Sequence, residues 1–178
     1  NMIGVAAGLA LSGKIPVLTS FACFLIGRVE SIRVSAAYNQ TNMKLVGTHA
    51  GIGIGEDGTS QMGLEDVAAM RALPHMTIIQ PADHIETQQA VRWMIEHNGP
   101  VYLRLTRQKM PDVHAAGYKW QPNKIDVLWE PAKKPAKYQA TIIASGGPVP
   151  HAVEAAKSLE AKGFSVRVAN ASTLLPFD

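Results

Sequence analysis

Residues 48–73 read Thr-His-Ala-Gly-Ile-Gly-Ile-Gly-Glu-Asp-Gly-Thr-Ser-Gln-Met-Gly-Leu-Glu-Asp-Val-Ala-Ala-Met-Arg-Ala-Leu. The stretch leaves a short apolar run, crosses a loop with glycines at positions 51, 53, 55, 58 and 63, and enters a helical pattern. Glycine lets a backbone take positive φ and approach a ligand closely. The polar side chains between these glycines can therefore converge on one small polar molecule. From composition alone, a surface loop facing water is an equally good interpretation.

Length and composition limit the possible classes of protein. The 178 residues are 47% apolar, which suits one domain of ordinary size or one and a half smaller ones. No run approaches the roughly 20 apolar residues of a membrane span, and the start, Asn1 to Gly4, lacks the charged leader of a signal peptide. The single cysteine, Cys23, excludes an internal disulfide framework and fits a reducing cytoplasm. We therefore expect a cytoplasmic protein without a membrane partner.

Charge gives no sign of a nucleic-acid partner. The formal net charge is +3, and the basic residues are scattered except for Lys133, Lys134 and Lys137 in a segment that contains prolines. A solvated linker explains that cluster better than a nucleic-acid patch does.

Strand and helix patterns alternate along the chain. Apolar runs predict strands at residues 15–19, 44–47, 76–79, 101–105, 141–144 and 165–169. Helical patterns lie at residues 1–11, from residue 25 to about 38, before Pro74, after Pro81 and at residues 150–162. This order predicts an α/β fold, with a parallel sheet covered by helices on both faces and an incomplete second α/β domain. We place the boundaries at 1–118 for the first domain, 119–137 for a linker and 138–178 for the second.

Several local features have structural interpretations. Asp83 can cap the helix after Pro81, and Glu86 can reach back to the same helix start. His84 and His97 are expected to face solvent. The helix at residues 1–11 is so apolar and so rich in small residues that we expect it to be buried, for example in a subunit interface. Gly146-Gly147 could bind an anion, but the motif is too short to indicate a nucleotide site.

Three motifs together resemble transketolases, which use thiamine diphosphate to move two-carbon units between sugar phosphates. Gly55 to Gln61, followed by Leu64-Glu65-Asp66, is similar to the family's loop and helix, with Thr59 where the family usually has proline. Phe21-x-x-Phe24 and Leu105-Thr106-Arg107-Gln108 also match. The resemblance covers nearly the whole chain. It implies that residues 1–118 are the pyrimidine-binding domain and that residues 138–178 begin the C-terminal domain.

The resemblance also implies roles for single residues. Phe21 and Phe24, which alone would be interpreted as core aromatics, match the pocket for the aminopyrimidine ring, and Gln61 matches a position near the cofactor. His49 and Arg107 match residues that hold the substrate phosphate, and Asp57 matches a residue that hydrogen-bonds a substrate hydroxyl. We therefore assign His49 and Asp57 to the catalytic centre. Arg104, Glu65 and Asp66 keep structural interpretations, the two acids because they favour the positive end of a helix dipole.

The same resemblance implies partners. The family's diphosphate site, with its Mg²⁺ or Ca²⁺, belongs to another domain or subunit, and no acidic cluster in this sequence has metal-site spacing. We expect a homodimer or a heterotetramer with that half. Asn1-Met2 resembles the end of the family's Glu-Gln-Asn-Met segment, whose glutamate would precede Asn1 by two places. A non-catalytic partner subunit lacking that glutamate is one alternative; deoxyxylulose-phosphate synthase and the β subunit of a 2-oxo-acid dehydrogenase are others.

Overall fold

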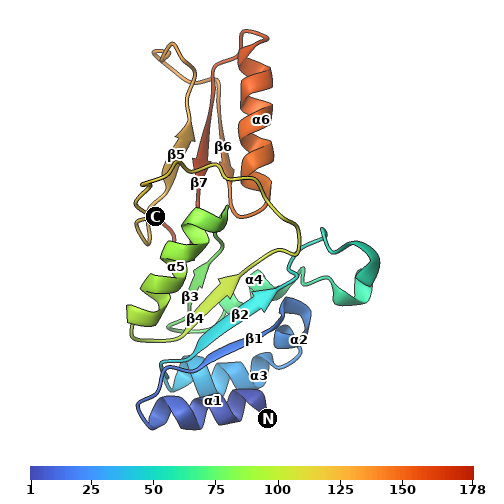
Figure 1. Cartoon of the computed structure of the whole chain (residues 1–178), viewed down its shortest axis with the longest axis vertical. Coiled ribbons are helices and arrows are strands. Elements are labelled where there is room, and N and C mark those ends of the chain that lie inside the picture. Colours follow the sequence, from blue (N-terminus) through green and yellow to red (C-terminus); the bar gives the residue numbers. More distant parts are fainter.

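A mainly parallel sheet organises the first part of the chain. The structure is a computed structural model that describes residues 1–178. The sheet has the order β1-β2-β4-β3-β8 (Figure 1). Its strands are β1 (Val17–Phe21), β2 (Lys44–Thr48), β3 (Thr77–Ile79), β4 (Val101–Arg104) and β8 (Thr173–Leu175). The first four are parallel to one another, whereas β8 runs antiparallel to β3.

Helices cover both faces of this sheet. One face carries α1 (Met2–Leu11), α2 (Ala22–Ile26), α3 (Val29–Ile32), the π-helical segment Arg33–Tyr38 and α4 (Asp66–Arg71). The other face carries α5 (His84–Glu96) and Trp120. Successive strand residues alternate between the two: Leu45 and Ile78 belong to the first apolar core, Val46 and Ile79 to the second. The predicted α/β fold with helices on both faces is confirmed.

A smaller sheet lies at the other end of the molecule (Figure 1). It has the order β5-β7-β6, formed by β5 (Asp126–Trp129), β6 (Ala140–Ala144) and β7 (Val166–Asn170). Strands β6 and β7 are parallel, and α6 (Pro148–Glu160) connects them. Ala156 of α6 packs against Val166 and Val168 of β7 in a separate small core. This is the predicted βαβ unit.

Strand β8 was not expected from the sequence. After β7 the chain crosses back and adds Thr173–Leu175 to the edge of the first sheet, with Leu175 opposite Ile78. The backbone N–H of Gln80 also donates to the carbonyl of Ser172 at 2.7 Å. The last residues of the predicted second domain therefore complete the sheet of the first, whereas β5, β6 and β7 form a sheet of their own.

The first helix is only partly buried within this chain. Helix α1 ends just before Gly13, whose φ of 83° suits glycine. Only Ile3 and Ala6 are buried, whereas Val5 and Leu11 are 62% and 75% exposed. Within this chain, α1 buries only one stripe against the sheet. Burial of its outer face in a subunit interface stays a prediction.

A buried polar cluster joins the two parts of the chain. We call it the clasp: Asp83, Glu86, His114 and Asn170, all at most 6% exposed. As predicted, Asp83 caps α5 by accepting from the backbone N–H of Glu86 at 2.9 Å, and it also accepts from His114 Nδ1 at 2.8 Å. Glu86 accepts from the backbone N–H of Ala82 at 2.7 Å and from Asn170 Nδ2 at 3.0 Å. The clasp thus links α5, the proline-containing connector at residues 111–137, in which His114 lies, and β7.

The histidines at the two ends of α5, His84 and His97, were both expected to face solvent. His84 is exposed, as expected, and pairs with Asp112. His97 is half-buried, so the expectation that it faces solvent is wrong. Its ring stacks on Trp93 with centroids 4.4 Å apart, and burial followed by the nearby Lys44 charge lowers its pKa.

The clasp should make stability depend on pH. Burial alone would lower the pKa of His114, but its hydrogen bond to Asp83 and the neighbouring carboxylates of Glu86 and Asp126 raise it. Burial alone would raise the pKa of Asp83, but the hydrogen bonds from His114 and three backbone N–H groups lower it. A histidine whose pKa is raised by folding stabilises the fold fully at a pH below its pKa in the unfolded state. An aspartate whose pKa is lowered by folding does so at a pH above its pKa in the unfolded state. The ion pair is therefore at full strength between about pH 4 and pH 6.5.

We expect His114→Gln to reduce the free energy of unfolding by about 1.5–3 kcal/mol at pH 5, the usual cost of losing a hydrogen bond to a charged group. The loss should be smaller at pH 8.5, because a rise in pH removes positive charge from His114 of the parent protein. Urea denaturation at the two pH values measures the difference. His84→Gln, which changes an exposed histidine, is the matched control. An equal loss at both pH values would show that the His114 charge contributes nothing.

Candidate functional site

Three neighbouring strands bring the candidate residues to one edge of the sheet. Phe21 ends β1 and pairs with Thr48, which ends β2 just before His49. Arg107 lies three residues beyond β4, the next strand in the sheet. The backbone N–H of Ala50 donates to the carbonyl of Leu105 at 3.1 Å, so the two chain segments stay together beyond their strands. Ligands of open α/β sheets gather at this carboxyl edge.

Phe21, Phe24 and His49 form an aromatic stack. The rings of Phe21 and Phe24 are nearly parallel, with an interplanar angle of 7° and centroids 5.5 Å apart. The His49 ring stacks on Phe21 at 3.8 Å. Phe21 is therefore partly covered, whereas Phe24 is 53% exposed and offers an open ring face. A planar heterocycle could stack there with its edges free for hydrogen bonds.

His49 has an unusual backbone. Its φ is 56°, in the left-handed region that residues with side chains rarely adopt. The conformation turns the chain sharply after β2 and places the imidazole over Phe21. Its Nδ1 lies 3.0 Å from Thr48 Oγ1, which fixes one side of the ring and leaves Nε2 for another partner. Such strain is commonly retained at functional sites.

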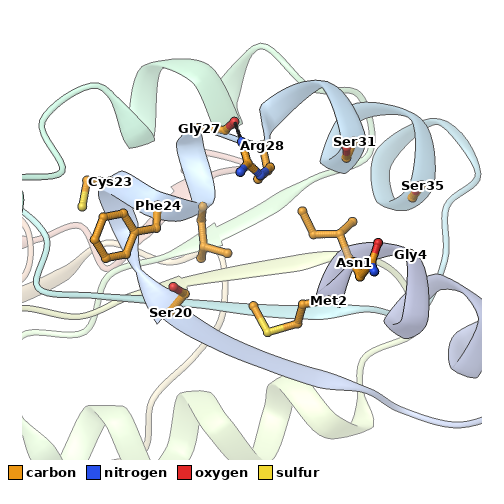
Figure 2. A pocket seen from close by; sticks show the side chains of 12 residues that line it. Asn1, Met2, Gly4, Ser20, Cys23, Phe24, Gly27, Arg28, Ser31 and Ser35 are labelled. Carbon is orange, nitrogen blue, oxygen red and sulfur yellow. Dashed lines mark hydrogen bonds between the residues drawn. The ribbon is translucent and has the colours of Figure 1, made fainter.

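A cavity of about 630 Å³ lies beside Phe24. Figure 2 shows Phe24, Cys23 and Ser20 on one side of it and the start of α1, with Asn1 and Met2, on another. Arg28, Ser31 and Ser35 add polar groups to the lining. Asp57 and Arg107 do not contribute to it. This cavity therefore provides a flat apolar wall with polar groups around it, but not the whole of the predicted site.

A second group lies on the loop between residues 49 and 63, which projects from the body of the molecule (Figure 1). The loop contains two short 3₁₀ helices, η2 (Gly55–Asp57) and η3 (Thr59–Gln61). Arg107 Nη1 lies 3.2 Å from Asp57 Oδ2 and also donates to the carbonyl of Ile54, and its Nη2 lies 3.3 Å from Glu56 Oε1. The backbone N–H of Glu56 and the Arg107 charge lower the pKa of Glu56. The carboxylates of Glu56 and Asp57 thus both lie against one guanidinium.

The end of the loop lies against the helix that carries Phe24. Gly63 approaches α2 so closely that a Cβ placed on it would be 2.6 Å from the Ala22 side chain. Helix η3, which contains the half-buried Gln61, also contacts α2. The six predicted site residues therefore form two groups: Phe21, Phe24 and His49 in one, Asp57 and Arg107 in the other, with Gln61 on the loop that runs between them.

Sequence reasoning missed how the base of this loop is built. Asp66 is completely buried and accepts from Tyr102 Oη at 2.7 Å and from Arg104 Nε at 2.8 Å. The structural interpretation of Asp66 and Arg104 is right: Asp66 lies in the first turn of α4, as expected, and its buried bonds to Tyr102 and Arg104 come in addition. The sequence offered one signal, since Arg104 stands within an otherwise apolar strand and needs a buried partner.

Two classes of feature are absent. The chain has no group of three His, Cys, Asp or Glu side chains that could hold a metal ion. None of its helices combines the length and the apolar composition needed to cross a bilayer.

Comparison with known proteins identifies relatives along the whole chain. Residues 1–113 match the family described as "Transketolase, pyrimidine binding domain", and residues 132–178 match "Transketolase, C-terminal domain". A putative transketolase C-terminal section from Methanocaldococcus jannaschii is 40% identical, with 100% of this chain and 55% of that protein covered. A 6-deoxy-6-sulfo-D-fructose transketolase subunit from a Clostridium species is 38% identical, with 100% of this chain and 54% of that protein covered.

Solved structures give the same result. A split gene transketolase described as an inactive beta4 tetramer superposes with a TM-score of 0.89 at 41% identity, covering 100% of this chain and 55% of that one. Transketolase from Campylobacter jejuni superposes at 0.86 with 26% identity, covering 97% and 27%. The chain thus spans about half the length of the split relatives that it matches. With matches over both parts of the sequence, the chain belongs to the transketolase family.

Proposed function

We propose that this chain supplies the pyrimidine-binding and substrate-binding side of a transketolase. The reaction is transfer of a two-carbon ketol unit from a ketose phosphate to an aldose phosphate. The observation that carries the proposal is the exposed Phe24 ring, stacked parallel to Phe21 and His49, at the same sheet edge as Arg107.

The residues fit the cofactor that the family generally uses, thiamine diphosphate with a divalent metal ion. The open face of Phe24 borders a cavity of about 630 Å³, which suits a flat aminopyrimidine ring. Phe21 supports Phe24 from behind, and Gln61 is presented from the neighbouring loop. When bound, the cofactor supplies the electron sink for carbon–carbon cleavage. This chain holds and orients the ring and keeps water from its apolar face.

Arg107 and His49 are assigned to the terminal phosphate of the substrate. A guanidinium matches a tetrahedral oxyanion through two parallel N–H groups. Both terminal nitrogens of Arg107 bind groups of the loop. Glu56, whose side chain is 86% exposed, is the partner most easily displaced by an incoming phosphate. The Clostridium relative is named for a sulfo-sugar, and a sulfonate would suit the same arginine.

Asp57 is assigned to a hydroxyl of the substrate. An ionised carboxylate is a strong acceptor for such a hydroxyl. Its contact with Arg107 keeps it oriented before substrate arrives. A substrate without that hydroxyl would leave the carboxylate unpaired, which gives a basis for discrimination.

The chain needs a partner for this activity. No metal-binding cluster lies within it, so the diphosphate and its Mg²⁺ or Ca²⁺ are assigned to the other transketolase domain or subunit. The relative described as an inactive beta4 tetramer fits a half that is inactive without its partner. We propose assembly with that half in a dimer or heterotetramer in the cytoplasm.

The test is a reconstituted assay. The chain, assembled with the diphosphate-binding half, thiamine diphosphate and Mg²⁺, is given a ketose phosphate and an aldose phosphate. We expect the ketose phosphate to be shortened by two carbons and the aldose phosphate to be lengthened by two. Parallel assays use pyruvate with glyceraldehyde phosphate, for deoxyxylulose-phosphate synthase, and branched oxo-acids, for a dehydrogenase subunit. Turnover only in a parallel assay would overturn the proposal. Cofactor-independent binding of the partner with no turnover would indicate a non-catalytic subunit.

A further inference from the structure

The base of the loop between residues 49 and 63 is held by one buried arginine. Arg104 leaves β4 with only 11% of its side chain exposed, and its Nε donates to Asp66 Oδ2 at 2.8 Å. Its Nη2 donates both to Asp66 Oδ1 and to the carbonyl of Gly63, each at 3.1 Å. One planar guanidinium therefore fixes the first turn of α4 and the last residue of the loop together.

Gly63 is the point where the loop closes. Its carbonyl accepts the backbone N–H of Gly51 at 2.9 Å, and Gly63 forms an isolated β-bridge with Ala50. The same carbonyl is the one that Arg104 binds. On its other side, Gly63 lies directly against Ala22 and the backbone N–H of Cys23, next to Phe24. A shift of Gly63 would therefore move the loop relative to the aromatic stack.

The geometry points to Arg104 as a positioning residue, which acts through Gly63 to hold Asp57 and Gln61 at a fixed distance from Phe24. This inference rests on the proposed function, because it concerns the same site. Arg104 itself does not contact substrate or cofactor in this assignment. A buried ion pair is weak evidence of a stabilising role, since apolar residues of similar volume often serve equally well. The three directed hydrogen bonds of Arg104 instead define a position.

Replacing Arg104 with lysine tests whether its charge or its hydrogen-bonding geometry matters. Arg104→Lys keeps the positive charge beside Asp66, but an ammonium on a flexible stem lacks the planar fork that reaches both Asp66 oxygens and Gly63. Tyr102→Phe is the matched control. It removes another hydrogen bond to Asp66 and leaves the bond from Arg104 to Gly63 in place.

Amide hydrogen exchange of the whole chain tests the inference without any assay of activity. In Arg104→Lys, we expect the Gly51 amide, which donates to Gly63, to exchange at least tenfold faster. The Ala50 amide, which donates to Leu105 instead, should keep its rate. Tyr102→Phe should leave the Gly51 amide unchanged. An unchanged Gly51 amide in Arg104→Lys, or equal acceleration of both amides, would overturn the inference.

Kinetics of the assembled enzyme test how Arg104 acts. We expect Arg104→Lys to lower kcat/KM about tenfold or more, and to cost much less when Asp57 is already changed to Asn, because coupled residues are non-additive. Independent, multiplying losses would show that Arg104 does not act through the loop. If the parent enzyme transfers no ketol unit, the proposed function fails, and the exchange experiment alone decides the role of Arg104.

Discussion

Replacing Arg107 with alanine is expected to lower kcat/KM for phosphorylated sugars about 100-fold, mainly through KM. Truncating a hydrogen-bonded partner of a charged group costs upwards of about 2 kcal/mol, and each 1.4 kcal/mol corresponds to about tenfold. Only 33% of the Arg107 side chain is exposed, so solvent weakens the interaction only in part. For an unphosphorylated donor such as hydroxypyruvate, kcat/KM should fall less than about threefold, because this donor has no phosphate for Arg107 to bind.

Lys109→Ala is the matched control for this measurement. Lys109 is an exposed cation two residues along the same segment and is assigned no contact with substrate. Lys109→Ala should leave kcat/KM nearly unchanged for both substrates. Equal losses on both substrates in Arg107→Ala would remove Arg107 from the phosphate role. They would leave it as the residue that holds the loop through Ile54, Glu56 and Asp57.

Replacing Phe24 with alanine is expected to weaken thiamine diphosphate binding by about 10- to 100-fold. Stacking of a base on an aromatic side chain is worth about 1–3 kcal/mol, and Phe24 presents the open ring face. The free energy of unfolding should change little, because Phe24 is 53% exposed and lies outside the apolar core. Calorimetric titration of the assembled protein with the cofactor measures the affinity, and thermal unfolding measures the stability.

Phe164→Ala provides the comparison. Phe164 is 47% exposed, close to Phe24 in exposure, but follows α6 in the second part of the chain. Its removal should leave cofactor affinity unchanged. An unchanged affinity in Phe24→Ala would show that the cofactor ring does not use this face, whatever the kinetics of the variant.

The sequence was sufficient to predict the order of the elements because the signals for them are local. The apolar runs at β3 and β4, the helix cap at Asp83 and the glycine after α1 each depend on a few neighbouring residues. Strand β8 has only three residues, too few for a periodicity, and it forms because β3 offers a free edge. No pattern within residues 173–175 carries that information.

Long-range partners explain the other surprises. Lys44 begins a predicted strand, yet it is fully buried and donates to the carbonyls of His97 at 2.8 Å and Gly99 at 2.7 Å. Burial lowers its pKa to about 8. The two carbonyls belong to residues just after α5, more than fifty residues from Lys44. The sequence near Lys44 therefore does not show that a buried ammonium finds its hydrogen-bond acceptors there.

In the candidate site, too, local motifs predict the residues but not their contacts. The residue types at positions 21, 24, 49, 57, 61 and 107 could be identified by resemblance, because each stands in a short motif. Their contacts could not. The stacking of His49 on Phe21 depends on a left-handed backbone at His49, and the pairing of Asp57 with Arg107 depends on how the whole loop closes at Gly63. Motif spacing fixes neither of these.

The path of β8 has a practical consequence for anyone who wishes to produce the first sheet by itself. A truncation placed in the proline-containing connector would strip the partner from the edge of β3, and an unprotected, apolar strand edge invites self-association. Precipitation of such a shortened protein would reflect the uncovered edge of β3 together with the loss of Asn170 from the clasp. Restoring Thr173–Leu175 through a designed tether should reduce that self-association, because it covers the edge of β3 again.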